Sequence, residues 1–451
     1  MKILFIHQNF PGQYLYLVQY LRRAGHKITG IGEDANIKKR GVIRGCTTIG
    51  YPSPQKAGPD THHYLRGLEA CVRRGQAVAR TLIKLRDRGF VPDVISLHPG
   101  WGEGLFVREI FPRTPLIMFC EYYFRAGQAD VGFDPEFPAD PDWIFSINLR
   151  NTAQIMSLLS ADCCLCPTEW QASRYPAFIR DNMRIIHDGI NTDFMTPDPE
   201  ERIVLQPLKK PGHSRILDRL KSAPPQGEEK VGDAGEREPA GKPLRLSRAD
   251  KVITYAARNL EPYRGIHAFL RSLPELQKRH PDAHVVIAGN DGTSYSRTPP
   301  GGCSYKDIYL GEISGKVDLS RIHFLGRIAY PSLRALFRVT TAHVYLTYPF
   351  VLSWSCLEAM SCGALTVASD TGPVPEVITH GDNGLLVDFF DREKLLATLN
   401  DILENPCAFD AIRSRARNSV VGKYRLDNCL GQQLSLLEDA VGGRLGSRTG
   451  T

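Results

Sequence analysis

Short runs of hydrophobic residues alternate with amphipathic stretches along almost the whole chain. The runs have the length of buried strands, and the stretches between them have the period of helices. In the first half, we predict strands at 2–7, 27–31, 93–98, 115–120, 163–167 and 183–187, and helices near 13–23, 60–88 and 142–159. This alternation predicts a parallel sheet covered by helices on both faces.

The same pattern restarts after residue 250. We predict further strands at 251–257, 284–289, 322–326, 343–348 and 365–369, and helices at about 391–403 and 408–440. A length of 451 residues is too great for one ordinary core and suits two domains. Two successive open α/β units each place a ligand crevice at the carboxyl ends of their strands.

The stretch 223–243 separates the two halves and is rich in proline, glycine and alternating charge. Such a composition cannot bury enough apolar surface to order itself. We therefore predict a mostly flexible interdomain insertion at 200–248, without catalytic residues, between domains at 1–199 and 249–425. A C-terminal helix and tail at 426–451 can cross back to the first domain.

Composition indicates an ordinary globular protein, with 42% hydrophobic and 23% charged residues. No apolar run has the roughly 20 residues of a membrane span, and MKILFIHQNF is too polar for a signal peptide. Eleven cysteines, mostly in apolar segments, favour reduced thiols and a cytoplasmic location. Cys163 and Cys166 have C-x-x-C spacing, but no second Cys or His pair stands nearby, which favours core packing over a metal site.

The net charge of +7 is uneven, because basic residues crowd the first hundred positions. Solvated helix faces explain this most simply. The alternative is peripheral contact with anionic lipid headgroups at the inner face of the membrane, where a lipid-linked acceptor would wait. Nucleic acid is not expected as a partner, because no binding motif accompanies the charge.

Residues 347–378 hold the pattern richest in chemistry: a strand end, an uncharged loop, and a helix expected to open at Ser355 with Glu358 in its first turn. Free backbone N–H groups at a helix start suit a diphosphate, and a carboxylate one turn inside can accept hydrogen bonds from a diol. Phosphate and diol occur together in a nucleotide, so we predict a nucleotide-sugar site. Ser355 and Glu358 also have the spacing of a capping box, which is the structural alternative.

A second segment, ITYAARNLEPYRG at 253–265, places Arg258 and Arg264 around a turn after a strand. Two guanidinium groups can hold a diphosphate and stabilise the charge that develops as it leaves. The alternative is an ion pair between either arginine and Glu261.

The stretch 347–378 resembles the signature of the family-4 retaining glycosyltransferases, which have two Rossmann-like domains in the GT-B architecture. In that family a loop glutamate that contacts the donor sugar precedes, by eight positions, a helix glutamate that binds the nucleotide ribose. Glu358 matches the second glutamate. The first falls at Phe350, and the loop glycines are replaced by Val351 and Ser353.

The resemblance extends to other segments and implies further site residues. Arg264 stands where the family usually has lysine, and Ser353 or backbone amides such as that of Leu352 would hold the sugar in place of the missing glutamate. On the acceptor side, Glu121 takes the place of a family histidine near the transferring carbon, and His98 also ends a strand. The remaining implied positions are Gly12 in HQNFPGQY, Gly289, Arg327 and Tyr330 near the base or phosphate, and Glu376 near the donor.

The resemblance implies an α/β GT-B fold whose two doubly wound domains face each other across a cleft. It further implies retaining transfer of a hexose-type sugar from a nucleoside diphosphate sugar to a glycan or lipid-linked acceptor, as in polysaccharide biosynthesis. No metal cofactor is expected, since the family works without one and no D-x-D cluster is placed at a pyrophosphate. Two alternatives remain open: a nucleotide-sugar epimerase, and a non-catalytic nucleotide-sugar-binding protein, motivated by Phe350.

Overall fold

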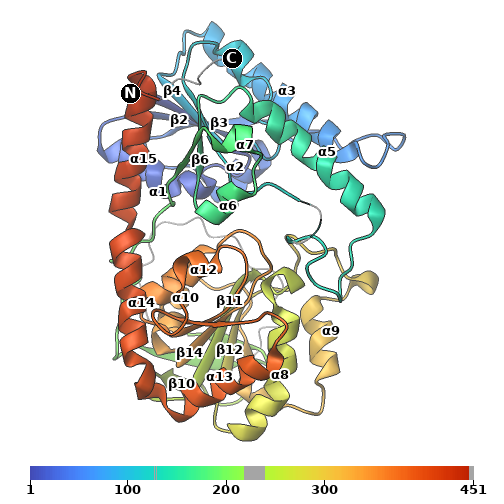
Figure 1. Cartoon of the computed structure of the whole chain (residues 1–451), viewed down its shortest axis with the longest axis vertical. Coiled ribbons are helices and arrows are strands. Elements are labelled where there is room, and N and C mark those ends of the chain that lie inside the picture. Colours follow the sequence, from blue (N-terminus) through green and yellow to red (C-terminus); the bar gives the residue numbers. More distant parts are fainter. Residues whose placement is uncertain (126, 128, 218–238, 446–451) are drawn as a thin grey trace. The chain divides into compact units, whose positions relative to one another are not determined.

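A computed structural model of the chain describes residues 1–125, 127, 129–217 and 239–445 (Figure 1). The chain forms two compact units. The first contains the residues up to Gly189 together with the last helix, and the second contains the described residues from Ile190 to Arg425.

The first unit is built on seven parallel strands in the order β3-β2-β1-β4-β5-β6-β7. The strands are β1 (Lys2–Ile6), β2 (Lys27–Glu33), β3 (Thr47–Tyr51), β4 (Val94–Leu97), β5 (Leu116–Phe119), β6 (Cys163–Cys166) and β7 (Met183–Ile185). The helices are α1 (Leu15–Arg23), α2 (Asp34–Arg40), α3 (Arg66–Asp87), α4 (Val107–Ile110), α5 (Pro141–Leu158), α6 (Glu169–Ser173) and α7 (Ala177–Arg180). Strand order reverses between β1 and β4, and ligands of such sheets bind at this switch point.

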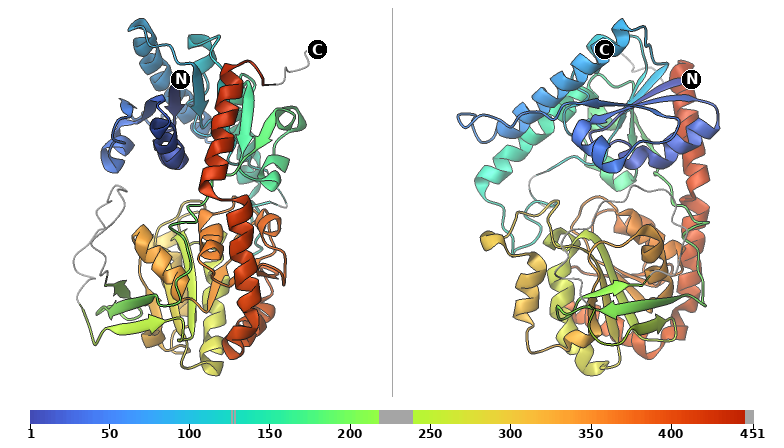
Figure 2. Two further views of the ribbon diagram at one scale, coloured as in Figure 1. Left: turned by 90° about the vertical axis from the view of Figure 1, so that its left-hand side faces the viewer. Right: turned by 180° about the vertical axis from the view of Figure 1, so that it is seen from behind.

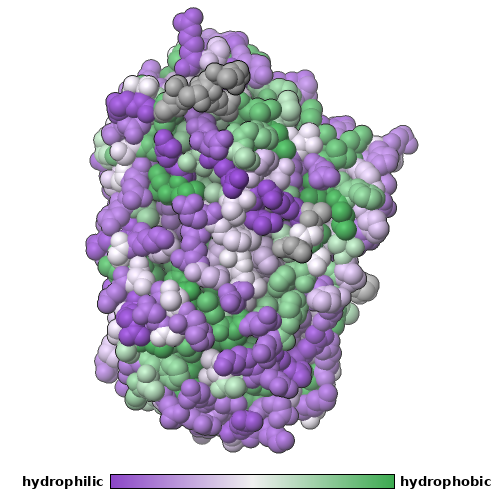
Figure 3. Space-filling view, in the orientation of Figure 1, coloured by the Kyte–Doolittle hydropathy of each residue, from purple (hydrophilic) through white to green (hydrophobic). Residues whose placement is uncertain are grey.

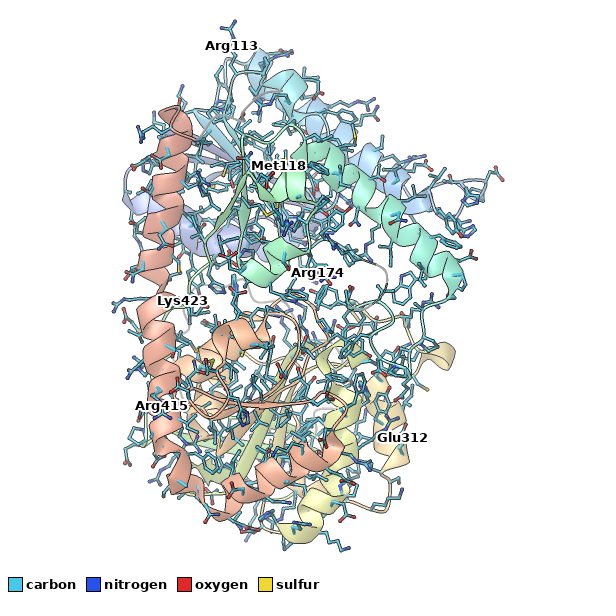
Figure 4. The ribbon with its side chains drawn as sticks, viewed as in Figure 1. Arg113, Met118, Arg174, Glu312, Arg415 and Lys423 are labelled. Atoms are coloured by element: carbon cyan, nitrogen blue, oxygen red, sulfur yellow. The ribbon has the colours of Figure 1, made fainter. Side chains whose placement is uncertain are left out.

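The central strands are mostly hydrophobic and, apart from Lys2, buried, as expected of a parallel sheet that is covered on both faces. Helices α3 and α5 pack against each other and run side by side in the views of Figure 2. Met118 of β5 lies inside this unit and is fully buried (Figure 4). The sequence did not predict the short segments α2 and β3, because their polar and apolar residues follow no clear period.

The C-terminal helix predicted at 408–440 consists of two helices, α14 (Asp410–Lys423) and α15 (Leu426–Val441). The break arises because the Tyr424 carbonyl accepts a hydrogen bond from the Ile190 N–H at 2.8 Å, so this backbone pairs outside the helix. Helix α15 packs on α1, β4 and β5 of the first unit, where Leu430 and Leu437 join its core.

The second unit is built on six parallel strands in the order β13-β12-β11-β14-β15-β16. The strands are β11 (Val252–Asn259), β12 (His284–Asn290), β13 (Ile322–Phe324), β14 (Ala342–Tyr345), β15 (Thr366–Ser369) and β16 (Leu385–Val387). The longer helices are α8 (Ile266–Arg279), α9 (Tyr305–Glu312), α10 (Tyr330–Val339), α11 (Trp354–Ser361), α13 (Arg392–Glu404) and α14, with a short α12 (Val374–Val377). The switch point lies between β11 and β14.

The expected insertion at 200–248 differs from the structure at both flanks. A three-stranded antiparallel sheet in the order β10-β8-β9 forms there, with β8 (Arg202–Pro207), β9 (Ser214–Ile216) and β10 (Leu244–Ser247). Ile203, Leu205 and Leu246 order these strands by burial in the core of the second unit. Residues 218–238 of the expected insertion lie outside the described residues.

Within the described residues, no helix is both long and apolar enough to cross a membrane. On the face shown in Figure 3, hydrophobic residues form separate patches among hydrophilic ones. Arg415 of α14 lies on the outside of the second unit (Figure 4), where it pairs with Asp382.

Candidate active site

Two histidines flank the switch point of the first sheet. His7 directly follows β1 and His98 directly follows β4, and both are buried. Their ring centroids are 5.4 Å apart, and the Trp101 ring stacks on His98 at 4.3 Å. The aromatic edge therefore lies where a doubly wound sheet binds its ligand.

His98 is oriented toward the predicted residue Glu121. The Gly100 N–H donates to Nδ1 of His98 at 3.1 Å, which assigns the ring proton to Nε2. Nε2 then donates to Oε2 of Glu121 at 3.3 Å. The side chain of Glu121 is 45% exposed, so the pair presents a fixed carboxylate at the strand ends.

Gly12 completes this edge. Its φ is +51°, and a Cβ at this position would lie 2.7 Å from the His7 ring, so a side chain is excluded. The sequence thus predicted three residues, Gly12, His98 and Glu121, that lie at one edge of one sheet.

Sequence reasoning missed His7 and Trp101, although both directly follow or adjoin predicted strand ends. Burial first, and then the electrostatic interaction with His98, hold the pKa of His7 well below its usual range, so the ring is neutral. Arg74 of α3 donates to the Trp101 carbonyl at 3.1 Å and ties the stacked indole to the scaffold.

In the second unit, Arg264 lies at the switch point between β11 and β14. Its Nη1 donates to Oγ1 of Thr347 at 2.9 Å and to the Val351 carbonyl at 3.3 Å. Burial opposes its charge, but the neighbouring tyrosines, Tyr345 first, outweigh that effect and raise the pKa of the guanidinium. A permanent cation is therefore held against the loop that follows β14.

Arg258 differs from Arg264. Its side chain is exposed on β11 and makes no hydrogen bond or ion pair with a residue of the described ranges. The ion-pair alternative for the two arginines is not found there, because the Glu261 carboxylate instead accepts the backbone N–H groups of the 294–296 turn at 2.8–3.1 Å.

Helix α11 begins at Trp354, one residue before the predicted start. The N-cap is Ser353, whose Oγ accepts from the Ser355 N–H at 3.4 Å. The capping-box interpretation was therefore wrong: the Glu358 carboxylate accepts from the Tyr330 hydroxyl at 2.7 Å instead. Burial raises the pKa of Glu358 to about 7, and the hydrogen bond from Tyr330 limits the rise.

The loop between β14 and α11 brings several predicted residues together. Ser353 and Glu358 both belong to α11 or its cap, and Val351 in the preceding loop is bonded to Arg264. The Leu352 side chain packs in the core of the second unit. The Phe350 ring is 2% exposed and packs on Tyr295 at 4.5 Å, so an aromatic cluster occupies the position where the family has a carboxylate.

The other predicted donor residues follow different strands of the same sheet. Gly289 lies in β12 with φ +156°, and a Cβ there would lie 2.7 Å from the Ala257 carbonyl. Arg327 is exposed after β13, and Glu376 lies in α12 after β15. These residues share one edge with Arg264 because the carboxyl ends of parallel strands meet there.

Among the described residues, no group of three or more His, Cys, Asp or Glu side chains could hold a metal ion.

Two family descriptions match the chain. Residues 24–195 match the Glycosyl transferase family 4 group, and residues 241–419 match the Glycosyl transferases group 1. A D-inositol 3-phosphate glycosyltransferase of Rhodococcus opacus is 24% identical over 185 residues, which are 40% of this chain and 40% of that protein. The chain thus spans about two fifths of the length of the curated relatives that it matches.

Solved structures resemble the chain over nearly its full length. A sucrose-phosphate synthase from Thermosynechococcus elongatus is similar with a TM-score of 0.70 and 15% identity, covering 98% of this chain and 100% of that one. Anabaena Alr3699/HepE in complex with UDP-glucose is similar with a TM-score of 0.62 and 15% identity, covering 97% and 100%. At this identity, the likeness establishes the fold.

Proposed function

Because the chain belongs to the family-4 glycosyltransferases with the GT-B fold, we propose that it transfers a sugar from a nucleoside diphosphate sugar to an acceptor hydroxyl with retention of configuration. The observation that carries the proposal is the loop between β14 and α11. It has the Arg264 guanidinium bonded to its carbonyl at Val351 and the Glu358 carboxylate one turn into its helix.

In the proposed reaction, the diphosphate lies at Arg264 and at the backbone N–H groups that open α11. The guanidinium is fixed before the reaction, so it stabilises the growing negative charge without reorganising. The bond between the anomeric carbon and the phosphate oxygen breaks. The acceptor oxygen bonds to the same face of that carbon, and its proton passes to the departing phosphate.

The proposal assigns the ribose diol to Glu358 and needs no metal ion, since Arg264 and the helix start supply the positive potential. UDP-glucose in the similar structure of Anabaena HepE supports a nucleotide sugar as the donor class. Arg258, Gly289, Arg327 and Glu376 remain proposed donor-side residues.

For the acceptor side we propose the edge formed by His98, Glu121 and Gly12, with a glycan or lipid-linked glycan as the acceptor. His98 fixes one carboxylate oxygen of Glu121, and the exposed remainder of that carboxylate can accept hydrogen bonds from sugar hydroxyls. Sugar rings also stack on aromatic faces. The Trp101 ring stacks on His98, which in turn is hydrogen-bonded to Glu121.

The test combines binding with turnover. Nucleoside diphosphates and their sugars are screened for thermal stabilisation, where a ligand at 100 times its dissociation constant adds roughly 2.7 kcal/mol. Stabilising donors are then incubated with glycan and polyprenyl-phosphate acceptors, and products are analysed by mass spectrometry and anomeric NMR. An inverted product would contradict retention, and indifference to every nucleotide would contradict the donor site.

A second candidate, a nucleotide-sugar-binding protein without turnover, is favoured by one observation. Phe350 is buried against Tyr295 and Tyr263, so its position offers no carboxylate to a sugar. Tight donor binding without hydrolysis or transfer across the acceptor set would support this candidate over the enzyme.

We also propose peripheral contact with anionic membranes through the exposed face of α3. Val72 and Ile83 are 43% and 38% exposed on that helix, and Arg80 and Lys84 are exposed beside them. Apolar side chains among basic ones suit a lipid surface of negative charge.

The membrane proposal is tested by sedimentation with phosphatidylcholine vesicles that contain or lack phosphatidylglycerol. Binding is expected only to the anionic vesicles and is expected to fall in Arg80→Glu/Lys84→Glu. The matched control Lys278→Glu/Arg279→Glu reverses two exposed charges of α8 in the second unit and should bind as the wild type does.

A further inference from the structure

Tyr330, the first residue of α10, is joined to the buried carboxylate of α11. Its hydroxyl donates to Oε1 of Glu358 at 2.7 Å, which is the hydrogen bond that this carboxylate makes within the described part of the chain. A hydroxyl bound to an ionised oxygen is among the stronger hydrogen bonds in proteins.

The other oxygen of Glu358 keeps a small contact with solvent. Glu358 as a whole is 5% exposed, and its Oε2 atom is not fully enclosed by the protein. Since Oε2 makes no hydrogen bond with a described residue, solvent must reach it. The carboxylate is therefore divided: one oxygen is held by Tyr330, and one is open.

The ring of Tyr330 is itself fixed. It stacks on the Phe194 ring with the centroids 5.2 Å apart and the planes 8° apart. Arg334, one turn later on α10, lies 4.2 Å from the centroid of the same Phe194 ring. A stacked ring leaves the hydroxyl little freedom except rotation of its own O–H bond.

The support under this stack returns to the helix of Glu358. The Phe194 N–H donates to the Asn191 side chain at 3.0 Å, and the next carbonyl, that of Met195, accepts from the Ser361 hydroxyl of α11. The segment that supports the Tyr330 ring is thus itself bonded to α11, the helix that carries Glu358.

We propose that Tyr330 is a positioning residue that holds Oε1 of Glu358 and thereby directs Oε2 to the ribose diol of a bound nucleotide. The inference rests on the nucleotide site proposed above. It assigns to Tyr330 a share in the preference for a ribose over a sugar without hydroxyls. A carboxylate that was free to rotate would lose conformational entropy when the diol bound, and this loss would weaken the binding.

The experiment compares two substitutions that each remove one hydroxyl from the second unit. Tyr330→Phe keeps the stacked ring and removes the hydrogen bond to Glu358. The control Tyr305→Phe removes a buried hydroxyl that donates to the Arg297 carbonyl at 2.8 Å. Calorimetry measures the affinities of UDP, ADP and GDP, and of the 2′,3′-dideoxy form of the tightest one.

Wild type and Tyr305→Phe are expected to prefer the ribonucleotide over its dideoxy form. Tyr330→Phe is expected to weaken ribonucleotide binding about tenfold and to change dideoxy binding by less than about twofold. An unchanged ratio in Tyr330→Phe would overturn this inference alone. A wild type that ignores the diol would overturn the proposed role of Glu358, and this inference with it.

The pH profile supplies a readout that a packing role would not move. The hydrogen bond from Tyr330 favours the ionised form of Glu358, so its loss should move the midpoint of ribonucleotide affinity to higher pH. The charged groups that act on the neighbouring Cys362, which are Glu358 itself, Arg334 and Arg338 of α10 and Arg417 of α14, are unchanged in the variant. A midpoint that stays in place, or moves to lower pH, would contradict the positioning role.

Discussion

Nε2 of His98 lies 3.3 Å from Oε2 of Glu121, although 23 residues separate them in the chain. The two side chains follow neighbouring parallel strands, β4 and β5, and meet at the carboxyl edge of their sheet. A buried imidazole thus orients a half-exposed carboxylate, and each of the two can be tested separately.

Glu121→Gln should lower kcat for sugar transfer at least tenfold while the melting temperature changes by less than a few degrees. The amide keeps the shape of the side chain but loses the charge that accepts hydrogen bonds from the acceptor. The matched control is Glu312→Gln, which should retain full activity. Glu312 lies at the end of α9 and forms an ion pair with Arg271 of α8. If both variants were equally active, the assignment of Glu121 to the acceptor site would be wrong.

Arg264→Ala should reduce kcat far more than it reduces thermal stability. A charge-assisted contact to the diphosphate contributes roughly 1.5 to 3 kcal/mol, so a loss of about ten- to hundredfold in kcat is expected. Arg264→Lys should recover part of it, because charge is kept while the two-point contact to Thr347 and Val351 is not.

Arg258→Ala is the comparison for Arg264, since this exposed arginine contributes to binding only through the ligand. Its melting temperature should equal that of the wild type, measured by differential scanning calorimetry. If the melting temperature of Arg264→Ala falls as severely as its kcat does, Arg264 has a structural role and the proposed phosphate contact is wrong.

Glu358→Gln should weaken nucleotide binding and also change how stability depends on pH. Burial raises the folded-state pKa from 4.5 to about 7, so the folded form binds a proton more tightly than the unfolded form does. The contribution of protonated Glu358 to the free energy of unfolding is therefore fully present below about pH 4.5. It is lost as pH rises through 7, and the loss is about 3 kcal/mol. Glutamine carries no such cost.

Urea unfolding at pH 5 and pH 8 measures this difference. The stability of Glu358→Gln relative to wild type should be greater at pH 8 than at pH 5. An equal difference at the two pH values would mean that the carboxylate is not buried in the folded protein in solution.

A chain of hydrogen bonds in the second unit predicts sensitivity to acid. Arg321 donates to His284, His284 to His323 at 3.1 Å, and His323 to the Ser214 hydroxyl at 3.0 Å. Burial first, and then the electrostatic interaction with His284, lower the pKa of His323 to about 4. The pKa of His323 in the unfolded chain is 6.5. The contribution of neutral His323 to the free energy of unfolding is therefore present above pH 6.5 and is lost as pH falls toward 4.

The loss attributable to His323 is about 3 kcal/mol, and His323→Gln should flatten the pH dependence of unfolding over this window. Its hydrogen-bond partner Ser214 belongs to β9, which pairs with β8, so hydrogen exchange of β8 and β9 should rise first in acid. An identical pH profile in wild type and variant would exclude His323 as the titrating group.

The alternation of hydrophobic runs and amphipathic stretches was enough to predict both parallel sheets and several of their longer helices. The edge strands β3 and β16 were missed because three to five residues with mixed burial leave no period. The break between α14 and α15 was missed because it depends on a backbone pairing with Ile190, more than 200 positions away.

For the candidate site, the local pattern pointed to Arg264 and His98, since it marks where a strand stops and the chain turns. Gly12, Glu121 and Ser353 were implied by the resemblance to a family. Their partners could not be predicted. That His98 faces Glu121 depends on which strands are neighbours. That Tyr330 holds Glu358, in place of the capping box that was the structural alternative, depends on how α10 packs on α11.

The amino-acid order alone thus defines the elements and the family, because the periods of strands and helices and the short loop motifs are local properties. The tertiary fold decides the charges and the contacts: the burial that raises the pKa of Glu358, the enclosure of Arg264 by the loop after β14, and the core that orders β8 and β10. These properties depend on desolvation and on side chains far apart in the chain, and neither can be obtained from a local pattern.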